Sequence, residues 1–223
     1  MVEPVSEAPA KPERYFATRY TFDPGRTPVW RAIARHLQRY IPAGATVCEL
    51  GSGYADWINH VDAGRKYALD LHADSARHCA PEVTFLCSET SRIEIESGSV
   101  DVILASNLLE HLGDAALHAT MSEIGRTLRK GGRLVLIQPD YYYCYRRYWD
   151  DFTHVKAWTH HSLPDFLSAS GFEVERVEAR FLPFSFKGRL PRSYWLTRLY
   201  LALPWRPWAA QMLVVARKAD LHV

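Results

Sequence analysis

Apolar positions along the chain switch repeatedly between two spacings, and this switching predicts alternating strands and helices. Five short apolar runs indicate strands: TVCELG, KYALDL, VTFLC, VDVILAS and GRLVLIQ, at 46–51, 66–71, 83–87, 100–106 and 132–138. Each run is apolar on both faces, which is typical of a parallel sheet covered by helices on each side. Two further runs, 173–181 and 210–218, predict the last strands.

Helical spacing separates these runs at 27–41, 114–132 and 161–172. Thr27 and Pro28 form a start signal for the first helix. On the second helix, Asp114 is expected to cap the N-terminus and Gly131 to end it, and Gly171 is expected to end the third. One face of the second helix carries Leu117, Met121, Ile124 and Leu128. The alternation predicts a doubly wound α/β domain at 15–218, after a loose tail at 1–14.

Composition narrows the function classes. The chain has 223 residues, of which 48% are hydrophobic, and a net charge of +2 with no basic run of five, so general nucleic-acid binding is not expected. No apolar run is long enough to span a membrane, and the polar N-terminus does not resemble a signal peptide. Without a CxxC pair, the cysteines are expected to be free thiols, with Cys48 and Cys87 buried, which predicts a cytoplasmic protein.

The end of the first strand is the first candidate binding site, because ligands of such sheets bind outside the carboxyl ends of the strands. Gly51 and Gly53 suit a tight strand-to-helix turn. A dinucleotide fingerprint would place a third glycine where Asp56 stands, and an acid there would repel a pyrophosphate. A nucleoside ligand without phosphates is therefore favoured. Glu49 could help to hold an ammonium group, and Asp70, at the end of the second strand, could accept both hydroxyls of a ribose.

The end of the fourth strand brings a second cluster, formed by Asn107, Glu110 and His111. A helical conformation would put the three side chains on one face. These oxygen and nitrogen donors could bind Mg²⁺ or a similar hard ion. Alternatively, they hold the loop by hydrogen bonds or contact the substrate directly.

Three ordered motifs resemble those of class I S-adenosylmethionine (SAM)-dependent methyltransferases: ELGSG with Asp70, SVDVILASNLLEHL, and LRKGGRLVLIQP. The resemblance implies a Rossmann-like seven-stranded sheet whose last strand is antiparallel. It also implies a set of SAM-binding residues: Gly51 and Gly53 at the methionine moiety, Asp70 with Leu71 at the ribose, Ser88 or Glu89 at the adenine, and Asn107 near the sulfonium. The alternatives are a dehydrogenase and a nucleotide-fold domain that binds nothing.

Two narrower resemblances concern the metal and the acceptor. NLLEH is similar to the ExxEH motif of metal-dependent O-methyltransferases, with Asn107 in place of the first glutamate, which implies Mg²⁺ at Glu110 and His111. RYTFDPGRTPVW, YWDDFTHVKAWTHHSL and FLPFSFKGRLP resemble bacterial methyltransferases encoded with polysaccharide-biosynthesis genes. That likeness implies a saccharide hydroxyl as acceptor. A narrower resemblance, to a sugar O-methyltransferase of the mycobacterial methylmannose polysaccharide pathway, implies a mannoside.

The segment YYYCYRRYWDDFTH, at 141–154, follows the fifth strand and predicts a substrate lid at about 140–160. Its aromatic faces and forked guanidinium donors suit a sugar or a planar aromatic substrate. The candidate substrate-binding residues are Tyr142, Tyr145, Arg146, Arg147 and Trp149. The same rings could instead cover the core or a partner in a homodimer.

An alcohol acceptor must lose a proton, and His154, His111 and Asp151 are the candidate bases. In the alternative interpretation, Asp151 and His154 only pin the insertion to the sheet. The aromatic, arginine-rich segment 181–208 could complete the lid, form an interface or contact a membrane surface. Two other functions stay open: methylation of a small aromatic or lipid-like metabolite, and a SAM-binding scaffold without catalysis.

Overall fold

A computed structural model describes residues 23–184 and 192–219, in which a seven-stranded sheet has the order β3-β2-β1-β4-β5-β7-β6. The first five strands are parallel, and β7 is antiparallel to both β5 and β6, as predicted. The strands are β1 (Thr46–Leu50), β2 (Arg65–Asp70), β3 (Val83–Cys87), β4 (Val100–Ser106), β5 (Leu128–Pro139), β6 (Phe172–Pro183) and β7 (Ala209–Lys218). The tail at 1–14 and part of the segment 181–208 lie outside the described residues.

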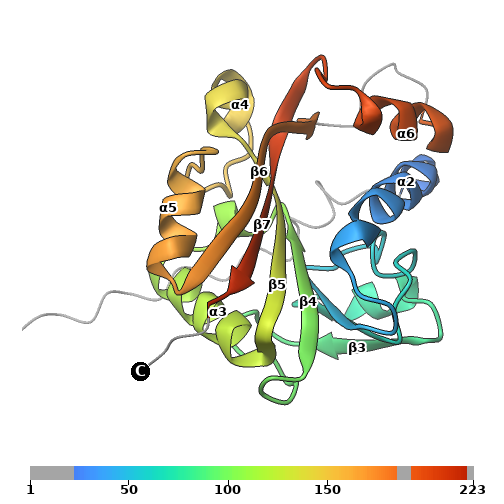
Figure 1. Cartoon of the computed structure of the whole chain (residues 1–223), viewed down its shortest axis with the longest axis vertical. Helices are drawn as coiled ribbons and strands as arrows, with labels where there is room; N and C mark the ends of the chain where they lie inside the picture. The colour runs from blue at the N-terminus through green and yellow to red at the C-terminus, as the bar shows by residue number, and fades with distance from the viewer. Residues whose placement is uncertain (1–22, 185–191, 220–223) are drawn as a thin grey trace, which may run out of the picture.

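Helices cover both faces of the sheet, with α2 and α6 on one face and α3 and α5 on the other (Figure 1). The α-helices are α2 (Thr27–Leu37), α3 (Asp114–Thr127), α4 (Tyr141–Tyr148), α5 (Ser162–Ala169) and α6 (Tyr194–Ala202). The 3-10 helices are η1 (Pro24–Arg26), η2 (Gln38–Tyr40), η3 (Ala73–His78) and η4 (Leu109–His111).

Alternate strand residues point to opposite faces, which gives the sheet two cores. In β1, Val47 packs toward the core that contains Trp30 of α2, whereas Cys48 packs toward the core that contains Leu117 of α3 and Leu163 of α5. The continuous apolar runs of the sequence therefore serve two helical layers, as predicted.

The ends of α3 differ from the prediction. Gly113 occupies the N-cap position, and Asp114 instead makes an ion pair with Lys156 at 2.6 Å. The helix ends at Thr127 because Leu128 already pairs with β4, opposite Val100. The extra residues form an irregularity within β5, where Gly131 adopts a left-handed φ of 67°.

A regular helix was expected after β1, and this expectation is wrong. Turns occupy the segment instead, with hydrogen bonds from Ala55 N to Ser52 O (2.7 Å) and from Asn59 N to Ala55 O (3.1 Å). Asp56 makes an ion pair with Arg26 at 3.0 Å. The loop therefore has no full helix dipole, and the charge of Asp56 is compensated within the chain.

The four cysteines are free, but Cys87 is exposed rather than buried, because β3 is an edge strand. Burial raises the pKa of the Cys144 thiol to about 12, which makes it an unreactive core residue. Among the described residues, no helix is both long and apolar enough to cross a membrane.

Candidate active site

Two glycines and a carboxylate of the neighbouring strand β2 fix the conformation of the loop after β1. Gly51 and Gly53 have φ angles of 66° and 50°, in the left-handed region that glycine adopts without strain. Asp70 Oδ2 accepts a hydrogen bond from Gly53 N (2.7 Å), and Oδ1 accepts one from His72 N (2.9 Å). Since a carboxylate oxygen accepts more than one hydrogen bond, Asp70 fixes the loop and can still receive ribose hydroxyls.

The ends of β1 and β4 meet beside this loop. A side chain on Gly51 would come within 3.3 Å of Leu108 Cδ1. Asn107 has a φ of 51°, a conformation that is uncommon for a residue with a side chain. Its backbone N–H donates to Ile137 O at 2.8 Å. The connections from β1 and β4 leave toward opposite sides of the sheet, and this crevice is where doubly wound folds bind nucleoside ligands. The residues around the crevice fit SAM.

Glu49 lies beneath the loop. It is buried, and its Oε2 accepts a hydrogen bond from Ile58 N at 3.0 Å. Burial raises the pKa of this carboxyl well above its ordinary value. The structure thus gives Glu49 a role in shaping the loop, and its contact with an ammonium group stays a prediction.

The segment after β3 carries the adenine-side candidates. Ser88 N donates to Asp70 O (3.2 Å) and Ser88 Oγ to Arg92 O (2.7 Å), whereas the exposed Glu89 accepts a bond from Ser91 Oγ. Leu71 follows Asp70 and is 57% exposed, so it offers an apolar surface beside the loop. Of the two candidates, Ser88 is thus the one hydrogen-bonded to the backbone of Asp70.

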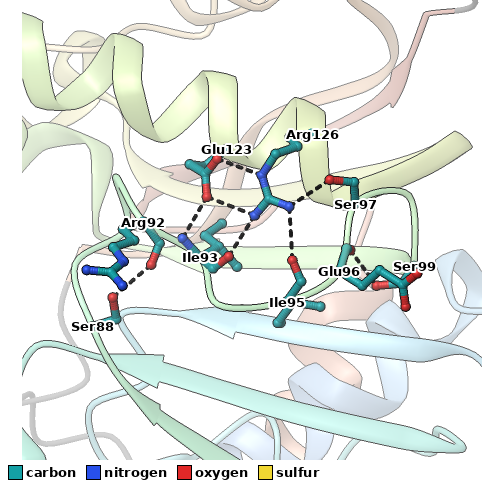
Figure 2. Close-up of polar contacts among 9 residues, drawn as sticks. All are labelled: Ser88, Arg92, Ile93, Ile95, Glu96, Ser97, Ser99, Glu123 and Arg126. Atoms are coloured by element: carbon teal, nitrogen blue, oxygen red, sulfur yellow. Dashed lines mark hydrogen bonds and ion pairs between the residues drawn. The ribbon is translucent and has the colours of Figure 1, made fainter.

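An arginine of α3 fastens the continuation of this segment, a feature that the sequence analysis missed (Figure 2). Arg126 donates to Ile93 O (2.6 Å), to Ile95 O (3.0 Å) and to Ser97 Oγ (2.9 Å). Two more bonds join its guanidinium to Glu123 at 2.7 and 2.9 Å, and they lower the pKa of that carboxyl. The connection from β3 to β4 is thereby held against α3.

Two residues after β4 and one after α4 form a cluster of a carboxylate and two imidazoles. One ligand atom each from Glu110, His111 and His154 lies within 4.8 Å of the others, and Glu110 is completely buried. The helical conformation that would put Asn107, Glu110 and His111 on one face does not form, because the 3-10 helix η4 covers only Leu109–His111 and Asn107 has a left-handed φ of 51°. His154 joins Glu110 and His111 from the segment after α4.

Asp151 reaches this cluster through Thr153, a residue that the sequence analysis passed over. Thr153 Oγ1 donates to Asp151 Oδ1 (2.7 Å), so its oxygen accepts from His111 Nδ1 (2.9 Å). Thr153 O lies 3.2 Å from the same nitrogen. The proton of a neutral His111 is then on Nδ1, and Nε2 faces Glu110 Oε1 at 4.0 Å. Asp151 is thus placed to orient His111 through Thr153, and its role as a base stays a prediction.

The predicted lid begins with α4. Asp140 caps this helix by accepting from Tyr142 N (3.2 Å), and it also binds His160 Nδ1 at 2.7 Å. Both partners were missed, since Asp140 looked like an ordinary residue after a strand. Tyr148 is buried, with its ring centroid 4.5 Å from that of His154 and its hydroxyl donating to Lys156 O.

A groove of about 650 Å³ lies between α4 and the neighbouring parts of β6 and β7. Three of the five predicted substrate residues, Tyr145, Arg146 and Arg147, line it, whereas Tyr142 and Trp149 are exposed without lining it. The opposite wall comes from β6, β7 and the segment between them: Arg180, Phe184, Trp205, Pro207, Trp208, Ala209 and Ala210.

Comparison with known proteins decides the class. A family model described as a methyltransferase domain matches residues 25–177. The chain belongs to this methyltransferase family. With the fold described above, this membership confirms the predicted class, a SAM-dependent methyltransferase, and excludes the dehydrogenase alternative. No curated protein is significantly similar to the methyltransferase in sequence.

Solved structures share the fold of the methyltransferase at low sequence identity. A chain from the complex of the Haloferax volcanii Trm112 methyltransferase activator with a methyltransferase is 18% identical, with a TM-score of 0.70 over 93% of this chain and 97% of that one. A SAM-dependent methyltransferase from Archaeoglobus fulgidus is 17% identical, with a TM-score of 0.62 over 85% and 94%. Geranyl diphosphate methyltransferase in complex with SAM is 16% identical, with a TM-score of 0.61 over 85% of each chain.

Proposed function

We propose that the methyltransferase transfers a methyl group from SAM to a hydroxyl of a saccharide, with an oligosaccharide such as a mannoside as acceptor. The observation that carries the proposal is the cluster of Glu110, His111 and His154, in which the carboxylate is completely buried. SAM supplies an electrophilic methyl group on a sulfonium. An alcohol becomes a sufficient nucleophile only when its proton is removed, and a hydroxyl acceptor therefore needs such a base.

In this proposal, different residues bind the cofactor and remove the proton of the acceptor. Asp70, Gly51 and Gly53 orient the cofactor, and Asn107 lies next to them at the end of β4. His111 Nε2 accepts the acceptor proton, because the hydrogen bond from Nδ1 to Thr153 fixes the tautomer. The hydroxyl oxygen then attacks the methyl carbon as the carbon–sulfur bond breaks, and the products are the methyl ether and S-adenosylhomocysteine.

The groove along α4 supports an extended acceptor. Cys144 lines the groove, and Tyr148, one helical turn later on the same face of α4, contacts His154 of the cluster. One turn of an α-helix rises about 5.4 Å. An acceptor held in the groove must therefore extend along α4 by about one turn to place a hydroxyl at His111, and several linked sugar rings can do this. Stacking on Tyr145 and Trp205, with guanidinium donors between, suits such rings.

The test is a transfer assay with labelled SAM on a matched acceptor panel: mono-, di- and tetrasaccharides, simple phenols, quinone precursors and prenyl alcohols. We expect methyl ethers only on saccharides, with turnover rising from mono- to tetrasaccharide. Transfer to phenols or prenyl alcohols alone would favour the alternative acceptor class. SAM binding without transfer to any acceptor, including those of a cell extract, would instead favour the non-catalytic alternative.

A metal-assisted version of the reaction is the second candidate, favoured by the spacing of Glu110, His111 and His154. Two imidazoles and one carboxylate suit Mn²⁺, Fe²⁺ or Zn²⁺ better than Mg²⁺, which prefers oxygen ligands. A cation held there would lower the pKa of the acceptor hydroxyl in place of a base. Chelation with EDTA should then abolish turnover. Mg²⁺, Mn²⁺ and Zn²⁺ are each added back to identify the ion that restores it. Full turnover after complete chelation would eliminate this version and leave the base mechanism.

A further inference from the structure

The region from α6 to β7 exposes large apolar side chains. Trp195 (76% exposed) and Leu199 (61%) project from α6, and Trp205 (64%) and Trp208 (73%) follow before β7 begins. These residues, together with Leu196, are called the tryptophan face below. Surface helices normally show polar residues to solvent, and a group of exposed aromatic and leucine side chains marks a contact site.

The helix α6, which carries part of the tryptophan face, packs against the core. Leu201 of α6 is only 2% exposed and belongs to the core cluster that contains α2. Tyr200 Oη donates to Pro207 O at 2.9 Å, which ties α6 to the segment that carries Trp205 and Trp208. Since this packing orders the backbone of α6, the exposed apolar groups are displayed by folded structure.

Uncompensated positive charge lies beside Tyr194 of α6. Residues 179–219 contain eight lysines and arginines and no aspartate or glutamate, and Arg192 and Arg217 are ion-paired with acids from other parts of the chain. The guanidinium groups of Arg31 and Arg198 lie 5.7 and 6.0 Å from the ring centroid of Tyr194, both residues are exposed, and neither has an ion-pair partner among the residues described. Arg206, by contrast, is committed to Glu178 at 2.8 Å.

We infer that the tryptophan face docks the methyltransferase on an anionic phospholipid surface. Tryptophan rings prefer the interfacial layer of a bilayer, leucines enter the acyl boundary, and uncompensated arginines are attracted to anionic headgroups. A second copy of the chain fits less well, because two-fold pairing would place Arg31 and Arg198 against the arginines of the partner. A single nucleic-acid strand would use the rings and arginines but not Leu196 and Leu199.

Docking would orient the active site. Figure 1 shows α4 and α6 at the same end of the molecule, beyond the ends of β6 and β7. Trp205 and Trp208 also line the groove along α4, so the acceptor groove borders the tryptophan face. A docked methyltransferase would therefore present its groove at the membrane surface, where an acceptor carried by a lipid would reach it. The docking itself does not depend on which acceptor is methylated.

The test is co-sedimentation of the full chain with vesicles of phosphatidylcholine alone and of equal parts phosphatidylcholine and phosphatidylglycerol. We expect binding to the anionic vesicles that weakens with added salt. The Arg31→Gln/Arg198→Gln double variant should lower the partition coefficient by about 30-fold. The Trp195→Ser/Leu199→Ser double variant should lower it by about tenfold or more. Both pairs of side chains are exposed or solvent-facing, and an unchanged thermal midpoint verifies folding.

The matched charge control is Arg65→Gln/Lys130→Gln, which removes the same charge near the starts of β2 and β5, at the end of the sheet opposite the carboxyl ends of its parallel strands. It should bind like the parent chain. Absence of binding to anionic vesicles at low salt would overturn the proposal, as would an equal loss in the control. A concentration-dependent dimer that Trp195→Ser/Leu199→Ser converts to monomer would show that a second copy covers the face. Tighter binding to poly(U) than to anionic vesicles would assign it to nucleic acid instead.

Discussion

Asp70 gives the sharpest test of the cofactor site, because its carboxylate is placed to serve both the loop and the ribose. Asp70→Asn keeps one acceptor oxygen and replaces the other by a donor. One charge-assisted hydrogen bond to a ribose hydroxyl is lost, and such bonds contribute about 1.5–3 kcal/mol. At about 1.4 kcal/mol for each factor of ten, SAM should bind roughly 10- to 150-fold more weakly. One of the backbone bonds, from Gly53 at 2.7 Å or from His72 at 2.9 Å, is also lost, which adds to the effect.

Isothermal titration calorimetry with SAM and with S-adenosylhomocysteine measures this loss. Asp70→Ala, which removes both acceptors, should weaken binding by about another tenfold. Asp74→Asn is the matched control, since Asp74 is an exposed acid of η3 four residues away. Binding of the Asp70→Asn variant within about threefold of the parent, at an unchanged thermal midpoint, would refute the assignment of the ribose to Asp70.

Four further outcomes follow from the contacts. Arg126→Met removes five hydrogen bonds from a side chain that is 35% exposed, and should lower the free energy of unfolding in urea by about 3 kcal/mol. Arg126 lowers the pKa of Glu123 below its ordinary 4.5, so this stabilisation is present above that pH, and the difference between parent and variant should shrink as the pH falls from about 7 to 3. Burial raises the pKa of Glu49 well above its ordinary 4.5, so ionisation costs stability as the pH rises, and Glu49→Gln should gain stability relative to the parent as the pH rises above that value. Thr153→Val should lower kcat about tenfold and shift its pH profile while SAM affinity is kept, because His111 Nδ1 loses the hydroxyl that links it to Asp151 and keeps only Thr153 O as an acceptor.

Each of these outcomes can fail separately. A stability loss under about 1 kcal/mol for Arg126→Met would show that water replaces its bonds. A difference in the free energy of unfolding between the parent and Arg126→Met that does not change with pH would show that ionised Glu123 does not contribute to it. Weaker SAM binding by Glu49→Gln would support the contact between Glu49 and the ammonium group that the sequence predicts. An unchanged pH profile for Thr153→Val would leave His154 as the residue that accepts the proton.

The fold was predictable from the sequence because burial on both faces leaves a strong signal. Strands such as β1 and β4 carry apolar residues on both faces, and a parallel sheet covered by helices explains that pattern. Local ends were less predictable: Leu128 joined β5 because pairing with β4 outweighed its helical spacing. The residues of the cofactor loop stood next to one another in recognisable motifs. The Thr153 contact joins residues 42 positions apart, and no local pattern encodes such a pair.

The order of the sheet has a consequence for biosynthesis. β7 is the last strand in the sequence, yet it lies between β5 and β6. During translation, β6 and the open edge of β5 therefore lack their shared partner until residues 209–218 leave the ribosome. Asp140 N, at the start of the lid, also waits for its acceptor, Ala210 O, at 2.9 Å. The nascent chain thus exposes two strand edges, which aggregate readily, and nascent-chain chaperones have a defined interval in which to protect them.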